Sequence, residues 1–418
     1  MKTQALKGMR DLLPAEQALR DYIQGKILET YRASGFERIS TPMLEDMENL
    51  DKSDGGDNLN LIFKVLKRGD KLTAALNTGD PKQLSDMGLR YDLTLPLSRY
   101  YAANKDKLPS PFKVIQTDRV FRAERPQKGR LREFVQCDID ILGDSSPNAE
   151  VELIDVTTRA LLNIGFTGFT VNINDRRILR GMLESMGFSA DTLDSVCITF
   201  DKMDKIGKEG VAEELEKEGF AKESIDKYLS LFDEVTEDVN GVRRLKELLE
   251  GFLDQKIAEE LETIIQSVDT VKTAKFQIVF DPTLVRGMSY YTGPIFEISI
   301  DGFGGSVGGG GRYDEMIGKF TGQKTCACGF SIGFERIVML LLERDYQVPS
   351  NAGKKAYLIE KNMPGDKLAA IFKEAAEERK NGSIVSVNMM KKNKKFQKEQ
   401  MTAEGYTEFK EFFCDGIK

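Results

Sequence analysis

The sequence from Phe112 to Leu142, FKVIQTDRVF-RAERPQKGRLRE-FVQCDIDIL, holds two strand-like segments on either side of a charged loop. Phe112–Phe121 and Phe134–Leu142 are rich in β-branched and aromatic residues, and Arg122–Glu133 between them contains a proline and a glycine. Apolar runs interrupted by turn-forming residues are typical of consecutive strands. The stretch therefore predicts a hairpin with a long, charged tip.

Basic residues are concentrated in this tip. Five of the fourteen residues from Phe121 to Phe134 are arginine or lysine, namely Arg122, Arg125, Lys128, Arg130 and Arg132. Because the planar guanidinium group matches the geometry of phosphate oxygens, such a loop suits a polyphosphate or an RNA end. A solvated hairpin tip without a ligand is the alternative interpretation, and the loop alone does not decide between them.

The second strand of the hairpin has one polar and one apolar face. Side chains alternate across a strand, so Gln136, Asp138 and Asp140 share one face, and the apolar residues between them share the other. The polar face could meet solvent, or it could line a pocket for a cationic or amino-bearing ligand. Spacing alone leaves both interpretations open.

Two later segments carry further residues suited to a binding site. Leu284–Gly293 offers one cation, Arg286, and two hydroxyl groups on adjacent tyrosines, although an ordinary loop with core tyrosines would look the same. Arg336, at the start of an apolar helix, is a second candidate for binding phosphate. Between them, the glycines of 302–311 predict a turn that allows close approach of the backbone to a ligand.

The order of elements predicts a β-based domain with a helical insertion. Strand-like sequence both precedes and follows a charged, helical block at about 172–272, and we expect the whole of 1–345 to form one domain. Residues 348–354 have the composition of a linker. Residues 354–418 then predict a small α/β domain.

Histidine is absent from the 418 residues, which excludes Ser-His-Asp and Cys-His hydrolysis, HExxH metalloproteases and any other histidine base. The five cysteines are scattered and form no CxxC pair, so neither a zinc site nor a disulfide framework is expected. No side chain is therefore predicted as a metal ligand. Any chemistry must depend on Arg, Lys, Asp, Glu, Tyr, Thr or backbone groups.

The formal net charge is −7, but the charges are unevenly distributed. Residues 353–418 contain 14 basic and 10 acidic residues, a balance of +4, which leaves −11 for the remainder. Five lysines fall within 391–398, which indicates either a solvated face or contact with an RNA backbone. No apolar run of 18 residues and no signal-like N-terminus occur, so we expect a cytoplasmic protein without membrane contact.

Taken in order, these segments resemble the histidyl-tRNA synthetase family, which belongs to the class II aminoacyl-tRNA synthetases. The resemblance covers nearly the whole chain and depends on several separate motifs. They are an N-terminal signature at Lys7–Pro14, motif 1 at Gly35–Glu45, an amino-acid-binding loop at Gly88–Thr94, motif 2 at Phe121–Phe134, a histidine-specific signature at Leu284–Thr292 and motif 3 at Gly329–Ile337.

The resemblance implies an α+β fold. The catalytic domain would contain a six-stranded antiparallel sheet flanked by helices, with the helical insertion within it, followed by a short C-terminal domain similar to an anticodon-binding domain. The implied activity is ATP-dependent ligation of L-histidine to tRNA(His) by a homodimer, through histidyl-adenylate and with Mg²⁺.

The resemblance also implies roles for individual residues. Arg286 and Arg122 would be the catalytic arginines. The ATP-binding residues would be Arg122, Glu124, Arg130, Phe134 and Arg336. The histidine-binding residues would be Asp92, Thr94, Gln136, Asp140, Tyr290 and Tyr291.

The chain departs from the family pattern in two places. Many bacterial members carry histidine where this chain has Ala123 and Val135, and the segment after Lys354 is shorter than the usual C-terminal domain. The alternatives are therefore a non-charging regulatory paralogue of the ATP phosphoribosyltransferase complex in histidine biosynthesis, and an RNA-binding module without catalysis. Arg122, Arg286 and Arg336 favour the synthetase, since the paralogue tends to lose catalytic arginines.

Overall fold

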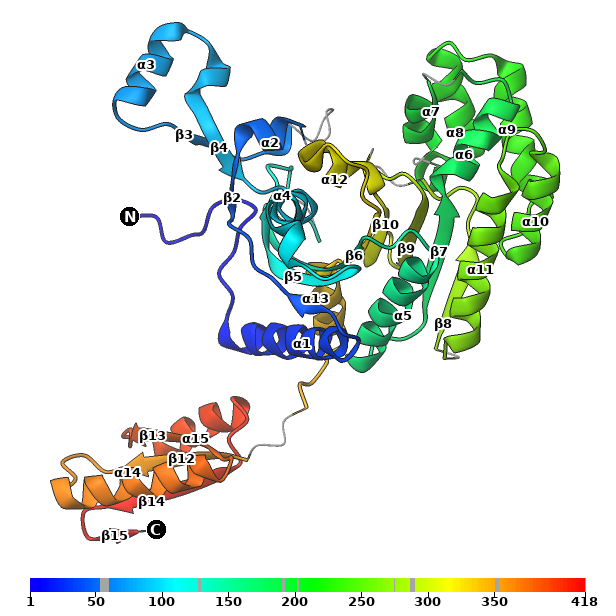
Figure 1. Cartoon of the computed structure of the whole chain (residues 1–418). Coiled ribbons are helices and arrows are strands. Elements are labelled where there is room, and N and C mark those ends of the chain that lie inside the picture. The colour runs from blue at the N-terminus through cyan, green and yellow to red at the C-terminus, as the bar shows by residue number, and fades with distance from the viewer. Residues whose placement is uncertain are drawn as a thin grey trace. The chain divides into compact units, whose positions relative to one another are not determined.

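The computed structural model describes residues 1–52, 60–126, 129–189, 192–200, 203–273, 275–285, 290–349 and 353–417 (Figure 1). The chain divides into two compact units, Met1–Tyr346 and Gln347–Lys418. The boundary between them falls next to the linker-like segment at 348–354.

An eight-stranded sheet forms the centre of the first unit. Six neighbouring strands are antiparallel, and one further strand pairs in parallel at each edge. In spatial order the strands are β1 (Glu37–Arg38), β5 (Phe112–Phe121), β6 (Glu133–Leu142), β11 (Ala327–Ile332), β10 (Gly308–Arg312), β9 (Pro294–Ile300), β7 (Phe169–Asp175) and β8 (Phe276–Phe280). The expected α+β fold is confirmed, with the six expected antiparallel strands at its centre.

The hairpin predicted from the sequence is formed by β5 and β6. Their register runs without a break from Phe112 opposite Leu142 to Phe121 opposite Glu133. The apolar face of β6 is buried from Cys137 onward, with Cys137 and Ile139 at 0% exposure. Alternation along β6 therefore directs its other face away from this core.

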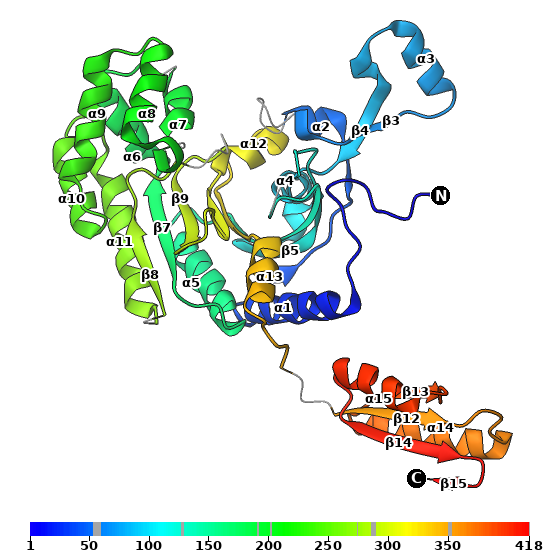
Figure 2. The ribbon, with the colours of Figure 1, turned by 180° about the vertical axis from the view of Figure 1, so that it is seen from behind.

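Helices cover one face of the sheet (Figures 1 and 2). They are α1 (Pro14–Ala33), α5 (Asn148–Asn163) and α13 (Phe334–Glu343). Helix α1 begins at a proline, whose missing N–H costs nothing in the first turn of a helix, and it ends just before Gly35. Ile23, Ile27 and Tyr31 on its inner face are completely buried.

A second group of elements lies on the other side of the sheet in both views (Figures 1 and 2). It contains α2 (Met47–Lys52), α4 (Thr94–Asn104) and α12 (Asp314–Thr321). A small sheet of β2 (Leu44–Asp46), β4 (Ser85–Leu89) and β3 (Lys64–Leu66) projects beside them and carries α3 (Asp70–Thr78).

The helical block lies between β7 and β8 in the chain. Its described helices are α6 (Arg176–Ser185), α7 (Leu193–Phe200), α8 (Met203–Lys217), α9 (Lys222–Glu234), α10 (Val239–Leu248) and α11 (Gln255–Val271). The block was expected from about residue 172, and its first helix begins at Arg176, because 172–175 continue strand β7 between β8 and β9. Asp175 ends the strand and caps α6 by accepting a hydrogen bond from the Arg177 N–H.

The glycine-rich segment is a strand in part, which corrects the predicted turn over 302–311. Gly308–Arg312 form β10, which pairs with β9 on one side and β11 on the other. Flanking backbones lie so close that a Cβ atom on Gly310 would come within 2.0 Å of the Gly329 carbonyl oxygen. Glycine is thus required by close approach within the sheet rather than by a turn.

The second unit is a four-stranded sheet with a helix on each face. Its elements are β12 (Lys354–Ile359), α14 (Gly365–Lys380), β13 (Ile384–Met389), α15 (Lys394–Ala403), β14 (Glu408–Phe413) and β15 (Gly416–Ile417), and the strand order is β13-β12-β14-β15. Tyr357 packs toward Ile371 of α14, whereas its neighbour Leu358 packs toward Met401 of α15. Successive side chains of β12 thus point alternately into two hydrophobic cores, one on each face of the sheet.

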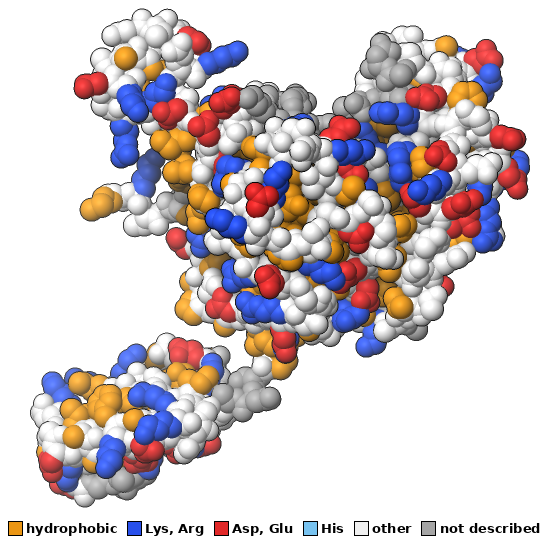
Figure 3. Space-filling view, in the orientation of Figure 1, with side chains coloured by type: hydrophobic (Ala, Val, Ile, Leu, Met, Phe, Trp, Pro, Cys, Tyr) orange, Lys and Arg blue, Asp and Glu red, His pale blue; other side chains and the backbone are white. Residues whose placement is uncertain are grey.

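Basic and acidic side chains are interspersed on the face drawn in Figure 3. Part of the lysine-rich segment is neutralised within the second unit, since Lys394 and Lys398 both pair with Glu411. Among the described residues, no helix combines the length and the apolar character needed to span a membrane.

Substitution of Gly310 tests the close approach of the central strands. We expect Gly310→Ala to lower the free energy of unfolding by at least about 2 kcal/mol, because the added methyl group overlaps backbone that cannot move away. Gly304→Ala is the matched control, since a Cβ atom there would have nothing within 4 Å. Urea denaturation of both variants is the measurement, and equal stabilities would contradict the assignment.

Candidate active site

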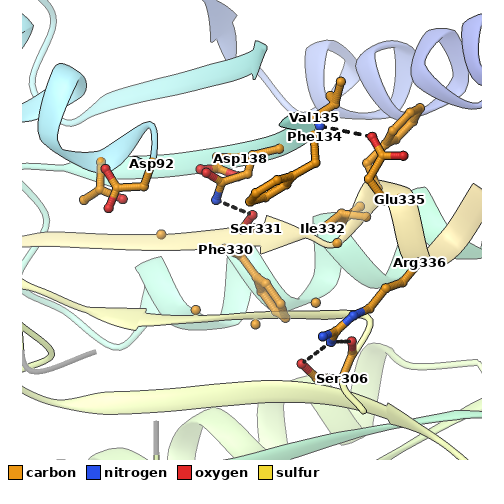
Figure 4. A pocket seen from close by; sticks show the side chains of 18 of the residues that line it. Asp92, Phe134, Val135, Asp138, Ser306, Phe330, Ser331, Ile332, Glu335 and Arg336 are labelled. Atoms are coloured by element: carbon orange, nitrogen blue, oxygen red, sulfur yellow. Dashed lines mark hydrogen bonds between the residues drawn. The ribbon is translucent and has the colours of Figure 1, made fainter. Parts of the chain in front are cut away.

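A cavity of about 320 Å³ lies in the first unit, over the polar face of β6 (Figure 4). Its floor comes from β6, β10 and β11, and its rim from the loop after β5, from Tyr290 and Tyr291, and from the start of α13. The volume is within the range of pockets for small ligands.

Eleven predicted site residues line this one cavity, although they are distributed from position 92 to position 336 of the chain. They are Asp92, Thr94, Arg122, Glu124, Arg130, Phe134, Gln136, Asp140, Tyr290, Tyr291 and Arg336. Arg286, predicted as a catalytic arginine, lies outside the described residues.

The polar face of β6 is buried in the cavity wall, so the solvent-facing interpretation of this strand was wrong. Asp138 and Asp140 are each only 5% exposed. Gln136 donates a hydrogen bond from Nε2 to Ser331 Oγ of β11 at 3.3 Å. Its Oε1 atom is buried and has no hydrogen-bond partner.

Asp140 is held by a tyrosine that the sequence analysis missed. Tyr313 donates a hydrogen bond from its hydroxyl to Asp140 Oδ1 at 2.6 Å, and it is itself almost fully buried. Burial raises the pKa of Asp140 to about 7, although the bond from Tyr313 acts in the opposite direction. The available signal was the position of Tyr313, directly after the glycine-rich strand.

Glycine makes room for this carboxylate. Asp140 lies opposite Gly329 in the register of β6 and β11. A Cβ atom on Gly329 would come within 1.9 Å of Asp140 Oδ1. Asp140 can therefore lie in the floor of the cavity only because the residue opposite it, Gly329, has no side chain.

Arg122 is fixed between two aromatic rings. Its guanidinium carbon lies 4.2 Å from the centre of the Tyr91 ring and 5.1 Å from that of Phe134. Its Nε atom also donates to the Tyr91 carbonyl oxygen at 3.2 Å. This arrangement restricts the guanidinium plane before any ligand binds.

Two more arginines lie at the rim of the cavity. Arg336 donates a hydrogen bond to the carbonyl oxygen of Ser306, as Figure 4 shows. Arg130 lies 3.6 Å from the carboxylate of Glu124. With Arg122, the cavity therefore has three cationic groups among the described residues, and all are on the side of the loop and α13.

Glu335 connects the cavity to the helices beneath the sheet, a role that the sequence analysis also missed. It accepts two hydrogen bonds from Arg20 of α1, at 2.6 and 2.7 Å. It also accepts one from the backbone N–H of Val135 at 3.1 Å. The start of α13 is thereby joined to the segment of β6 that carries Phe134.

The described residues contain no group of three or more Asp, Glu or Cys side chains arranged to hold a metal ion. The cavity instead separates charge. Buried carboxylates lie on its floor, and arginines lie at its rim. Such a site suits a ligand that carries a cationic group at one end and phosphates at the other.

The raised pKa of Asp140 predicts a pH dependence of stability. The folded chain keeps a proton on Asp140 that the unfolded chain loses, so this residue lowers the free energy of unfolding as pH rises from about 4 to 7. We therefore expect the free energy of unfolding of Asp140→Asn, relative to that of the wild type, to increase by at least ~1 kcal/mol between pH 5 and pH 8.

Urea denaturation at the two pH values is the measurement for this prediction. Asp86→Asn, at an exposed position of the projecting sheet, is the matched control for the change in charge. A stability difference between Asp140→Asn and the wild type that stays constant or falls with pH would contradict it.

Comparisons with known proteins agree on one family. The model of the family described as histidyl-tRNA synthetase matches residues 8–337. A curated histidine–tRNA ligase from Leifsonia xyli is 43% identical over 413 residues, which cover 96% of this chain and 94% of that protein. Another from Christiangramia forsetii is 38% identical over 348 residues, which cover 81% of this chain and 76% of the relative.

Solved structures agree with the sequence comparisons. The crystal structure of histidyl-tRNA synthetase from Nostoc sp. PCC 7120 has a TM-score of 0.81 and 27% identity, and the match covers 99% of this chain and 92% of the other. A Bacillus halodurans structure, titled as an ATP phosphoribosyltransferase regulatory subunit/histidyl-tRNA synthetase, has a TM-score of 0.77 at 22% identity, which shows a shared fold alone. From the match over 8–337 and the 43% identity to a curated member, the chain belongs to the histidyl-tRNA synthetase family.

Proposed function

We propose that this chain is a histidine–tRNA ligase that joins L-histidine to tRNA(His) in two steps. The observation that carries the proposal is that one cavity holds both arginines suited to phosphates and buried acids suited to an amino acid. The curated names of the relatives support it.

In the first step, a carboxylate oxygen of histidine attacks the α-phosphorus of ATP, and the bond to the leaving pyrophosphate breaks. In the second step, a ribose hydroxyl at the 3′ end of the tRNA attacks the carbonyl carbon of histidyl-adenylate, and AMP leaves. Transfers of this kind depend on positioning and charge neutralisation more than on a protein base. A chain without histidine can therefore perform them.

The nucleotide would lie along the arginine side of the cavity. Arg122 would neutralise the α-phosphate, which suits its fixed position between two rings. Phe134 would stack on the adenine and Glu124 would accept from its amino group. Arg130 and Arg336 would bind the distal phosphates.

The amino acid would lie over the acidic floor. Asp92 and Thr94 would hold the α-amino group, and Gln136 would contact the backbone end of the substrate. Asp140 would accept a hydrogen bond from the imidazole, with Tyr291 as its second partner and Tyr290 alongside.

Two further components complete the proposal. Arg286 would act as the catalytic arginine beside the reacting phosphate. Mg²⁺ typically binds through one or two carboxylates, water and substrate phosphates, so it needs no cage of protein ligands. The cavity has phosphate-binding arginines, and the described residues include no group of three acids arranged to hold a metal ion, which would fit an ion that arrives with ATP and screens its phosphate charge.

The remaining proposals concern partners and location. The second unit would contact tRNA through the exposed lysines that form no ion pair with a described residue, namely Lys391, Lys392 and Lys395. We also propose a cytoplasmic homodimer that associates through the motif 1 segment, Gly35–Glu45.

The regulatory paralogue has less support. Curated relatives that cover most of the chain are named as ligases, whereas the structure whose title includes the regulatory subunit shares only the fold. Arg122 and Arg336 also lie in the cavity, where a non-charging paralogue would not need them.

The first test is histidine-dependent exchange of pyrophosphate into ATP by the purified chain. We expect exchange with histidine and none with the other amino acids, because only the imidazole can use both Asp140 and Tyr291. Absence of exchange from folded protein would overturn the proposed function. Co-purification with an ATP phosphoribosyltransferase would then favour the paralogue.

Substitution of Arg122 tests the assignment of the nucleotide side. We expect Arg122→Ala to reduce the exchange rate by about 100- to 1,000-fold, the usual loss for one preorganised charge. Arg119→Ala is the matched control, since Arg119 is on the same hairpin but is exposed and pairs with Glu133. Similar rates for the two variants would show that Arg122 does not bind the reacting phosphate.

A further inference from the structure

One buried acid in the cavity has no role in the proposed reaction. Asp138 lies between Gln136 and Asp140 on the polar face of β6 and lines the cavity, but it belongs to none of the motif positions assigned above. It is only 5% exposed, and its Oδ1 atom has no hydrogen-bond partner. A buried acceptor without a donor is costly, which makes a ligand the natural partner.

A second unpartnered acceptor lies beside it. Gln136 Oε1 is also buried without a hydrogen bond, and Gln136 and Asp138 are two residues apart on the same face of one strand. Ser331 of the neighbouring strand accepts from the Gln136 amide nitrogen and also hydrogen-bonds the Asp138 carboxylate, but Gln136 Oε1 and Asp138 Oδ1 themselves have no partner. Two acceptors at one point of the floor require a ligand with at least two donors.

Asp92 lines the same cavity but comes from a different segment, just before α4. Its negative charge acts on Asp138, and both side chains are drawn lining the same pocket in Figure 4. Asp92 is positioned by accepting a hydrogen bond from the Leu95 N–H at 3.2 Å. Three acceptors from two separate segments therefore line the same cavity, and two of them are close enough for their charges to interact.

We propose that Asp138 accepts one of the three N–H donors of the substrate α-ammonium group, with Asp92 and Gln136 accepting the other two. A protonated amine offers three donors and no acceptor, which matches this set of oxygens. The inference rests on the proposed function and adds a residue to its amino-acid site.

The hydrogen bond from Tyr313 to Asp140 supports assigning the α-ammonium group, rather than the imidazole ring, to Asp138. Tyr313 already donates to Asp140, and Asp140 faces the gap left by Gly329. Asp138 instead lies opposite Ser331 in the strand register, one step nearer Gln136. The backbone end of the substrate, rather than its ring, therefore reaches Asp138.

The electrostatics of this part of the cavity agree with binding of a cation. Burial, together with the charge of Asp140, raises the pKa of Asp138 well above its usual range. An ionised Asp138 is therefore unfavourable without a ligand. An ammonium group would stabilise it.

Ligand binding by Asp138→Asn tests the inference. Titration calorimetry without ATP would compare L-histidine with imidazolepropionate, which keeps the ring and the carboxylate but lacks the amine. We expect histidine to bind about 10- to 100-fold more weakly than to the wild type, since a charge-assisted hydrogen bond is lost. The affinity for imidazolepropionate should stay unchanged.

Asp140→Asn is the matched control on the same face of the same strand, and it should lower the affinity for both ligands. The inference would be overturned if Asp138→Asn lowered the affinity for both ligands equally, or if it lowered neither affinity. If the wild type neither binds histidine nor exchanges pyrophosphate, the proposed function fails as well. If the wild type does both while Asp138→Asn keeps its affinity for histidine, only the role of Asp138 fails.

Thermal unfolding separates binding from folding. Replacing a buried carboxylate by a neutral amide of the same shape should leave the melting temperature unchanged or raise it. If Asp138→Asn does not fold, Asp138→Ser provides the same comparison with a smaller neutral side chain. Loss of affinity for both ligands in that variant would equally count against the ammonium contact.

Discussion

Strands β10 and β11 approach each other so closely that the sheet has no room for a side chain at Gly310, and the Asp140 carboxylate of β6 occupies the place that a side chain at Gly329 would need. Backbone hydrogen bonds continue through this region, so the sheet remains intact while space opens above it. The cavity depends on the glycine at position 329, because the acidic side chain of Asp140 enters the space that this glycine leaves.

Stability and ligand binding impose opposite requirements on this floor. Asp138 and Asp140 are buried in one strand face, and burial raises the pKa of each. Neutral residues there would stabilise the fold by itself better than these acids do. Acids at these positions are instead suited to a cationic substrate, an arrangement typical of sites where function limits stability.

The rim of the cavity is fixed by contacts that extend into the helical layer. Arg20 of α1 pairs with Glu335 of α13, and Glu335 also binds the backbone of β6. This pair is almost completely buried, so loss of either partner would leave an uncompensated charge. The orientation of Phe134 and the start of α13 thus depend on a helix at the opposite end of the sequence.

Local sequence determined the hairpin of β5 and β6, the polar face of β6, the helical block and the family motifs, because alternation, turn residues and motif spacing are properties of neighbouring residues. It could not show that Gly308–Gly311 form a strand, since glycine has no strand preference of its own and close packing requires it there. The sequence did not predict the roles of Tyr313, Glu335 and Arg20 for a similar reason. Each of them forms its hydrogen bond with a residue more than 150 positions away in the chain. Only tertiary structure decides such contacts, because they arise from the order in which distant strands and helices pack.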